Sequence, residues 1–260
     1  MATGFEAEAR KVIEIAGSDA SSFLQGLITN DIAGADAGLI YAALLTPQGK
    51  YLFDFFVARD GERYLLDIAA DRAAALTQRL TLYKLRADVT LADTDLRVFH
   101  AWDSDAGWPD PRDPALGRRA FATAAPDGLT DGGRAAAWED LRITQGVPMT
   151  GHELIAEESY ILEAGFARLN GVDFRKGCYV GQEVTARMHH KTELRKGLAV
   201  VLVEGSAAAG DEVLSGEKVA GTLHSVAGDK GLANLRYDRA EGAMLRAGDA
   251  NLQLVQRLAD

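Results

Sequence analysis

The sequence predicts an α+β fold in two unequal parts, residues 1–195 and residues 196–260. Segments with helical and extended patterns alternate up to about residue 190, which is typical of a mixed module. Beyond Gly197 the apolar runs are short and are separated by glycine and aspartate, which predicts a small antiparallel barrel or sandwich. The sequence contains no internal repeat and no low-complexity linker.

The first predicted elements are a strand and a helix. Alternation over residues 11–17, ending in glycine, predicts a short strand. A helix is expected over residues 18–32, where Ser18 is a suitable N-cap and apolar residues recur at helical spacing. Those apolar residues are Ala20, Phe23, Leu24, Leu27 and Ile28. Gly26 either weakens this helix or marks a close approach to it.

The clearest β region covers residues 41–69. The Asp60-Gly61 pair lies between two apolar runs and predicts a hairpin, while Pro47-Gln48-Gly49 predicts an earlier turn. Residues 71–85 follow with apolar side chains at helical spacing, so we expect a helix that Asp71 caps.

The middle of the chain changes character. Two further strands are predicted in "ADVTLADTD" and "LRVFHAW". Residues 103–136 are rich in proline, glycine, aspartate and alanine, so we expect loops in an irregular, exposed segment. A helical pattern returns at residue 135, and Gly146 and Pro148 are expected to end that helix.

Composition restricts the possible functions. The hydrophobic fraction of 47% and the charged fraction of 25% are those of an ordinary globular protein. A net charge of −10 argues against direct nucleic-acid binding, and no apolar run approaches a membrane span. The first residues carry three glutamates and fit neither a signal peptide nor a transit peptide, so a cytoplasmic location is expected.

The single cysteine, Cys178, lies in "FRKGCYVGQEVTARMHH". Arg175 and Lys176 precede it, and a helix, "GQEVTARM" (181–188), is expected just after it. Cations and a helix N-terminus both favour a thiolate. Gly177 and Gly181 permit close approach of the backbone to a ligand, or a positive φ. The alternative is a small buried apolar residue, because free cysteines are among the most buried side chains. One cysteine cannot form an internal disulfide or hold an iron–sulfur cluster alone.

Asp54 is the second candidate. Both faces of "KYLFDFFVA" are apolar, so the strand is expected to be covered on both sides and Asp54 to be buried. A buried carboxylate needs a partner. That partner is either an arginine, such as Arg86 or Arg142, or a ligand with adjacent N–H donors, such as a pterin or a guanine edge.

The octapeptide "KGCYVGQE" (176–183) closely resembles the signature of the YgfZ family of folate-binding proteins, whose mitochondrial relatives are iron–sulfur assembly factors. Five further segments resemble the family in the same order. They are "SSFLQGLITNDI" (21–32), "LLTPQGKYLFDFFV" (44–57), "LYKLRADVTL" (82–91), "LRITQGVPMTGHEL" (141–154) and "AGTLHSV" (220–226). Residues 103–136 carry no recognisable family feature.

The YgfZ family is similar in fold to the T-protein of the glycine cleavage system, a tetrahydrofolate-dependent aminomethyltransferase. The resemblance implies a T-protein-like folate-binding module of two α+β subdomains over residues 1–195, followed by a β-barrel over residues 196–260. The T-protein has an acidic pair where this chain has Phe53-Asp54, and a glutamate where this chain has Thr144. Both departures argue against aminomethyl transfer, because that reaction needs a carboxylate positioned near the reacting amine.

The resemblance therefore implies an accessory protein rather than a classical enzyme. It implies tetrahydrofolate, or another reduced folate, bound by Asp54, Phe53 and Arg142. Cys178 would be the reactive thiol, and it would contribute to an iron–sulfur cluster shared with a partner. The other expected site residues belong to the motif: Lys176, Gly177, Tyr179, Gly181, Gln182, Glu183 and Arg187.

Three functions remain open at this point. The first is iron–sulfur cluster assembly or maintenance, with folate and with assembly or client proteins as partners, supporting cluster-dependent enzymes such as tRNA-modifying radical enzymes. The second is a folate-dependent aminomethyltransferase or demethylase. The third is a docking module that has lost folate.

Overall fold

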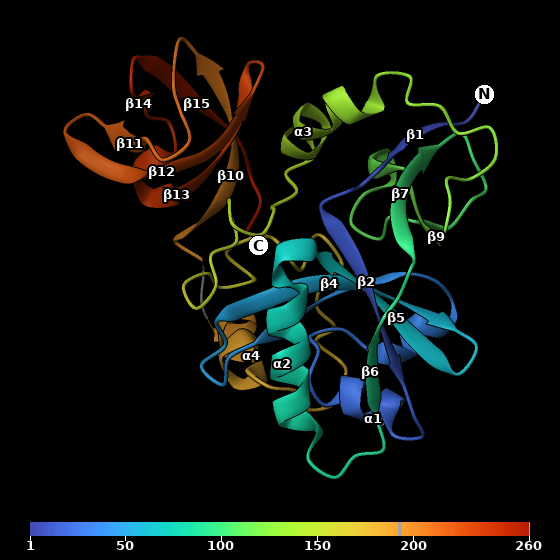
Figure 1. Ribbon diagram of the computed structural model, residues 1–260. Coiled ribbons are helices and arrows are strands. Elements are labelled where there is room, and N and C mark those ends of the chain that lie inside the picture. The colour runs from blue at the N-terminus through green and yellow to red at the C-terminus, as the bar shows by residue number, and fades with distance from the viewer. Residues whose placement is uncertain (192–193, 260) are drawn as a thin grey trace. The chain divides into compact units, whose positions relative to one another are not determined.

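The computed structural model describes residues 1–191 and 194–259 (Figure 1). The chain forms two compact units, and neither is continuous in sequence. The first unit comprises Met1–Pro47, Leu52–Ala136 and Asn170–Gln182. The second comprises Gln48–Tyr51, Ala137–Leu169 and Glu183–Asp260.

The first unit is built on a five-stranded sheet with the order β3-β4-β5-β2-β6. Its strands are β2 (Arg10–Ala16), β3 (Ile40–Leu45), β4 (Tyr51–Asp60), β5 (Arg63–Ala69) and β6 (Thr90–Asp93). The predicted hairpin is confirmed: β4 and β5 are antiparallel, Asp60 pairs with Arg63, and Gly61 turns with a φ of 62°. Figure 1 shows α1 (Ala20–Gln25) and α2 (Ala73–Lys84) beside this sheet, and their apolar residues share one core with it.

The expected helix over residues 18–32 is shorter than predicted. It ends at Gln25, because Ile28 forms a β-bridge with Leu44 and the Thr29 amide donates to the Ala43 carbonyl. A second short helix, η1, covers Ile32–Asp36. Ser18 does not cap α1, since its hydroxyl donates to Asp88.

The helix α2 also begins later than expected. A 3-10 turn, η2 (Ala70–Arg72), precedes it, and Asp71 lies in that turn. The residue before α2 is Arg72, which makes no side-chain capping hydrogen bond. The predicted cap at Asp71 is therefore wrong, although the helix itself is confirmed.

A second sheet in the first unit has the order β1-β7-β9-β8. Its strands are β1 (Thr3–Glu6), β7 (Arg97–Trp102), β8 (Trp108–Pro109) and β9 (Arg118–Ala122), with the 3-10 turn η3 (Pro114–Leu116) before β9. Two of these strands lie within residues 103–136, where only exposed loops were expected. The expectation failed because β9 pairs with β7, a long-range contact that the proline- and glycine-rich composition does not reveal.

The second unit contains the predicted β-barrel, which is confirmed as a closed sheet with the order β10-β13-β12-β11-β14-β15. Its strands are β10 (Lys196–Glu204), β11 (Glu212–Ser215), β12 (Lys218–Ala227), β13 (Lys230–Arg236), β14 (Leu245–Ala247) and β15 (Ala250–Arg257), with α5 (Tyr237–Ala240) after β13. The chain also forms α3 (Arg134–Thr144) and α4 (Gln182–Lys191). Ile143 of α3 packs with the buried barrel residues Leu198 and Leu232. No helix among the described residues is long and apolar enough to cross a membrane.

Candidate functional site

The loop at residues 170–182, here called the signature loop, is hydrogen-bonded to the segment that follows α1. The Lys176 ammonium donates to the carbonyl oxygens of Gln25, Ile28 and Asn30, at 2.9, 2.6 and 2.8 Å. These acceptors are about 150 residues away in sequence. Two of the motifs that resembled the YgfZ family therefore meet in one place within the first unit.

Further hydrogen bonds join the same two segments. The Thr29 hydroxyl donates to the Gly171 carbonyl at 2.7 Å, and the Asp173 amide donates to the Thr29 carbonyl at 3.0 Å. The Asn30 side-chain amide donates to the Asn170 carbonyl at 2.7 Å. The start of the signature loop is thus held by backbone and side-chain groups of residues 29 and 30.

Cys178 lies on this loop and is exposed. The helix predicted just after the cysteine is confirmed: α4 begins at Gln182, one residue later than expected. Tyr179 and Lys176, on either side of the exposed Gly177-Cys178 pair, are buried. The loop therefore presents the thiol to solvent between two side chains that point into the protein. The alternative of a buried, purely apolar cysteine does not describe this position.

Lys176 differs from its expected part in the site. Its side chain is only 7% exposed, and burial lowers the pKa of Lys176 to about 8, although Asp31 and Asp173 act to raise it. An ammonium has three N–H donors, and all three have backbone acceptors here. No N–H group of Lys176 remains to donate to the Cys178 sulfur, so a hydrogen bond from this cation to the thiol is not part of the site, and the expected electrostatic activation stays a prediction.

The remaining motif residues divide into two groups. In the signature loop, the Tyr179 ring centroid lies 5.2 Å from the Lys176 ammonium, and the Gln182 side chain donates to the Gly177 carbonyl at 3.4 Å. On α4, Glu183 and Arg187 form an exposed ion pair with each other at 2.9 Å, and such pairs at this spacing contribute little stability.

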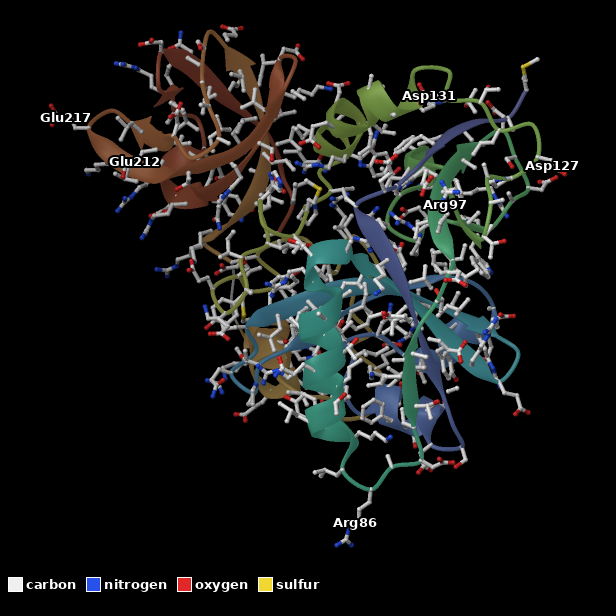
Figure 2. The ribbon with its side chains drawn as sticks, viewed as in Figure 1. Arg86, Arg97, Asp127, Asp131, Glu212 and Glu217 are labelled. Carbon is white, nitrogen blue, oxygen red and sulfur yellow. The ribbon has the colours of Figure 1, made fainter. Side chains whose placement is uncertain are left out.

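Asp54 is buried, as predicted, with 5% of its surface exposed. The Tyr41 hydroxyl donates to its Oδ2 atom at 2.9 Å. Arg86, one of the two expected arginine partners, is exposed in the turn after α2 and projects outward (Figure 2). Burial lowers the pKa of Arg112, Asp110 raises it most, and Tyr41 and Asp54 add smaller raising effects, so the arginine close to Asp54 is ion-paired with another carboxylate.

Phe53 and Asp54 do not lie on one face of β4. Successive side chains of a strand point to opposite sides, and Phe53 belongs to the apolar core that β4 shares with α1 and α2. The Arg72 guanidinium lies 5.1 Å from the Phe53 ring centroid. The structure therefore does not bring the two residues together on one ligand surface.

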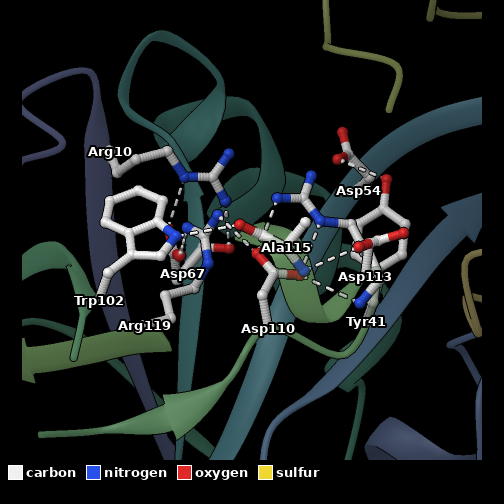
Figure 3. Close-up of polar contacts among 10 residues, drawn as sticks. Arg10, Tyr41, Asp54, Asp67, Trp102, Asp110, Asp113, Ala115 and Arg119 are labelled. Carbon is white, nitrogen blue, oxygen red and sulfur yellow. Dashed lines mark hydrogen bonds and ion pairs between the residues drawn. The ribbon is translucent and has the colours of Figure 1, made fainter. Parts of the chain in front are cut away.

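A buried ionic network lies beside Asp54 in the first unit (Figure 3). Asp67 accepts from Arg10 and from Arg119, each at 2.6 Å. Asp110 accepts from Arg112 at 2.9 Å and from Arg119 at 3.4 Å. Burial alone would raise the pKa of Asp110, but Arg112 and Arg119 hold it well below its usual range.

The same network surrounds Phe56, the next residue after Asp54 on its face of β4. The guanidinium carbons of Arg119, Arg112 and Arg10 lie 3.9, 4.7 and 5.7 Å from the Phe56 ring centroid. Sequence reasoning missed Arg112 and Arg119 because both belong to residues 103–136. The run "RRAFA" (118–122) has two arginines followed by three apolar residues and shows no alternation, so it carried no clear local signal for a strand.

Arg142 is buried in the second unit, where all of its nitrogens have partners. Nε donates to Glu139 at 2.8 Å, and Nη1 donates to Glu153 at 3.2 Å. Nη2 donates to Ser225 at 2.9 Å, and the Ser225 hydroxyl donates to Glu153 at 2.5 Å. The motif segments 141–154 and 220–226 thus meet in an internal network. A folate contact by Arg142 stays a prediction, and its guanidinium is already engaged.

Within residues 1–191 and 194–259, no group of three or more His, Cys, Asp or Glu side chains could hold a metal ion.

Comparison with known proteins identifies relatives over most of the chain. The family model described as "CAF17, C-terminal beta-barrel domain" matches residues 195–257. Human mitochondrial iron–sulfur cluster assembly factor IBA57 is 33% identical over 288 aligned residues, covering 94% of this chain and 81% of the human protein. The IBA57 homologues of Mycosarcoma maydis and Neurospora crassa are 38% and 35% identical.

The coverage of these relatives is unequal. The alignments cover 72% and 76% of this chain, but only 54% and 53% of the two fungal proteins, so the match spans about half their length. Among solved structures, the glycine cleavage aminomethyltransferase T of Bartonella henselae superposes with a TM-score of 0.73 at 15% identity. That match covers 98% of this chain and 85% of the other, and it shows a common fold.

These relatives correct two expectations. The cytoplasmic location is contradicted, because the IBA57 relatives are mitochondrial proteins. That expectation depended on the composition of the first residues, which does not determine a compartment. The resemblance to YgfZ is correct in fold and in general class, but IBA57 is the specific match. At 33% identity over most of both chains, the protein belongs to the IBA57 family of iron–sulfur cluster assembly factors.

Proposed function

We propose that this protein takes part in iron–sulfur cluster assembly or maintenance, with Cys178 supplying one thiolate ligand to a cluster shared with a partner protein. The single observation that carries the proposal is the exposed thiol on a loop whose start is hydrogen-bonded to residues 25–30. The names of its relatives support the same class of function.

The chemistry of clusters defines the partner. Clusters of the common types are held by about four thiolates, and this chain contains one cysteine. The partner must therefore bring the remaining ligands, which is expected of a cluster carrier with its own cysteines. Clients of the assembled cluster would include radical enzymes, such as those that modify tRNA, because their chemistry uses an iron–sulfur cluster as cofactor.

Complementation tests the role of the thiol. The assay uses cells that lack their own family member. Cells that carry the Cys178→Ser variant should show lipoyl synthase or tRNA methylthiolation activity at least about tenfold lower than cells that carry the wild-type protein, because serine is a poor cluster ligand. Met244→Ala is the matched control, since Met244 is another exposed sulfur side chain. Wild-type activity of Cys178→Ser at equal protein level would refute the ligand role.

We also propose that a reduced folate binds through the Asp54 face of β4. The chemistry of Asp54 supports this, because a buried carboxylate can accept from the adjacent N–H groups of a pterin. Of the three predicted folate residues, the proposal depends on Asp54. Phe53 lies in the apolar core, and Arg142 is saturated by internal partners.

Calorimetry tests folate binding directly. Titration with tetrahydrofolate should give a measurable heat, and Asp54→Asn should weaken the affinity by about tenfold or more, because a charge-assisted hydrogen bond is lost. Asp71→Asn is the control, since Asp71 is exposed in η2. No heat at millimolar folate would refute binding and favour the docking-module alternative.

No particular observation favours aminomethyl transfer. The likeness to the T-protein is a likeness of fold, and one fold carries many functions.

A further inference from the structure

We infer that Lys176 is the positioning residue for Cys178: its buried ammonium ties the signature loop to residues 25–30 and so fixes where the thiol is presented. The inference deepens the proposed function and rests on the ligand role of Cys178. In this inference Lys176 holds the loop in position, whereas the sequence led us to expect that its charge would favour the thiolate.

The first support is the identity of the acceptors. Helix α1 ends at Gln25, and the last carbonyls of a helix have no partner within the helix. The Lys176 ammonium donates to the Gln25 carbonyl and to those of Ile28 and Asn30 just beyond it. A lysine side chain is a known way to satisfy such carbonyls. The contact therefore stabilises two segments at once, the end of α1 and the signature loop.

The second support is the arrangement around the thiol. Lys176 holds the loop two residues before Cys178, and the buried Tyr179 with the core-packed Val180 holds it directly after. Each residue of a chain spans at most ~3.6 Å, so Cys178 cannot move far while both sides are held. Exposure of the thiol and restraint of its backbone are thus combined in a short stretch.

The third support is that the lysine has no donor left for the sulfur. The three N–H groups of Lys176 are used by three carbonyl oxygens. A shared cluster needs its ligands at defined positions, so a restrained loop serves ligation without any hydrogen bond from the lysine to the thiol.

The test compares Lys176→Met with wild type in the full chain, without a cluster. Hydrogen exchange of residues 25–30 and 170–182 should accelerate by at least about tenfold, because the opening of these segments becomes easier. Alkylation of Cys178 by iodoacetamide at one fixed pH should proceed at the wild-type rate or faster. The chain has one cysteine, so the alkylation signal is unambiguous.

Two further variants complete the design. Lys50→Met is the matched control, because the Lys50 ammonium also donates to a backbone carbonyl, that of Glu158, at 2.7 Å, and lies in the second unit. It should leave both readouts unchanged. Lys176→Arg keeps donors and charge and should restore much of the exchange protection. If the methionine variant does not fold, Lys176→Gln decides by the same readouts.

The inference is overturned by either of two results. Unchanged exchange in the signature loop would mean that Lys176 does not anchor it. Alkylation slowed by about threefold or more would mean that Lys176 activates the thiol after all, because fewer thiolates would be present. Both readouts use protein without cluster, so their outcome is independent of whether Cys178 ligates a cluster in cells.

Discussion

One deeply buried cation from each compact unit, Lys176 from the first and Arg142 from the second, can be compared, and the two have different surroundings. Lys176 in the first unit is 7% exposed, and Arg142 in the second is 2% exposed. Arg142 is paired with the carboxylates of Glu139 and Glu153. Lys176 donates only to backbone carbonyls. Arg142 is ion-paired directly with carboxylates, whereas Lys176 is hydrogen-bonded to carbonyl dipoles and is influenced electrostatically by the carboxylates of Asp31 and Asp173.

The difference indicates what each cation does. A buried charge with carboxylate partners is part of a structural network, and its loss leaves an unpaired anion. A buried charge without them is less favourable, and burial lowers the pKa of Lys176 to about 8 for that reason. The less favourable cation lies two residues from the exposed thiol, where holding a loop in place matters more than stability.

The largest expected effect is that of Arg142→Met. The variant should lower the free energy of unfolding by about 3–5 kcal/mol, because Glu153 would remain buried without its cationic partner. Urea denaturation measures this loss. The double variant with Glu153→Gln should recover part of it, since the unpaired charge is then removed. A loss below about 1 kcal/mol would show that the second unit does not depend on this network.

The second prediction concerns the pH dependence that Lys176 contributes. Its pKa is about 8 in the folded protein and has an ordinary value of 10.5, which we take for the unfolded chain. Between these values the unfolded state holds more protons, so the free energy of unfolding rises with pH. The slope is at most ~1.4 kcal/mol per pH unit for one proton.

Subtraction isolates this contribution. The difference in free energy of unfolding between wild type and Lys176→Met, measured by denaturant titration from about pH 7 to 10, should grow in favour of wild type above about pH 8. Lys50→Met serves as the control for the loss of a lysine elsewhere in the chain, since it leaves Lys176 in place. A difference that is flat with pH would mean that Lys176 keeps an ordinary pKa.

The local elements of the fold were predictable because their signals are local. The Asp60-Gly61 hairpin, the helix α2 and the short strands of the barrel follow from turn residues and periodicity. The length of α1 was not predictable in this way, because Ile28 pairs with Leu44 instead of continuing the helix. The strand β9 was missed for a similar reason, since its partner β7 lies beyond the window of any local pattern.

In the candidate site, too, features that depend on neighbouring residues were predictable and long-range contacts were not. The sequence identified Cys178 and the burial of Asp54, which depend on neighbouring residues. It could not predict that the Lys176 ammonium donates to carbonyls about 150 residues away, because every residue has a backbone carbonyl and the sequence does not mark which ones act as acceptors. The period of two along β4 separated Phe53 from Asp54 in the sequence, and a folate contact by both residues stays a prediction.

A smaller effect is expected for Gly181→Ala, within the signature loop. Gly181 has a φ of 84°, in the left-handed region where a side chain is unfavourable. The variant should lower the free energy of unfolding by about 1–2 kcal/mol. Thermal denaturation followed by circular dichroism measures the change. Wild-type stability would mean that the turn before α4 can adopt another conformation at no cost.

The smallest expected effect is that of Gly177→Ala, which sharpens the comparison between structural and functional demands within one motif. A Cβ atom at Gly177 would meet no heavy atom within 4 Å apart from its chain neighbours, and its φ lies outside the left-handed region. The free energy of unfolding should therefore change by less than about 0.5 kcal/mol in the same denaturation experiment. A loss above about 1 kcal/mol would contradict the described loop. If stability is kept while cluster-dependent activity falls in the complementation assay, the demand for glycine beside Cys178 comes from the approaching partner, whereas that at Gly181 comes from the fold.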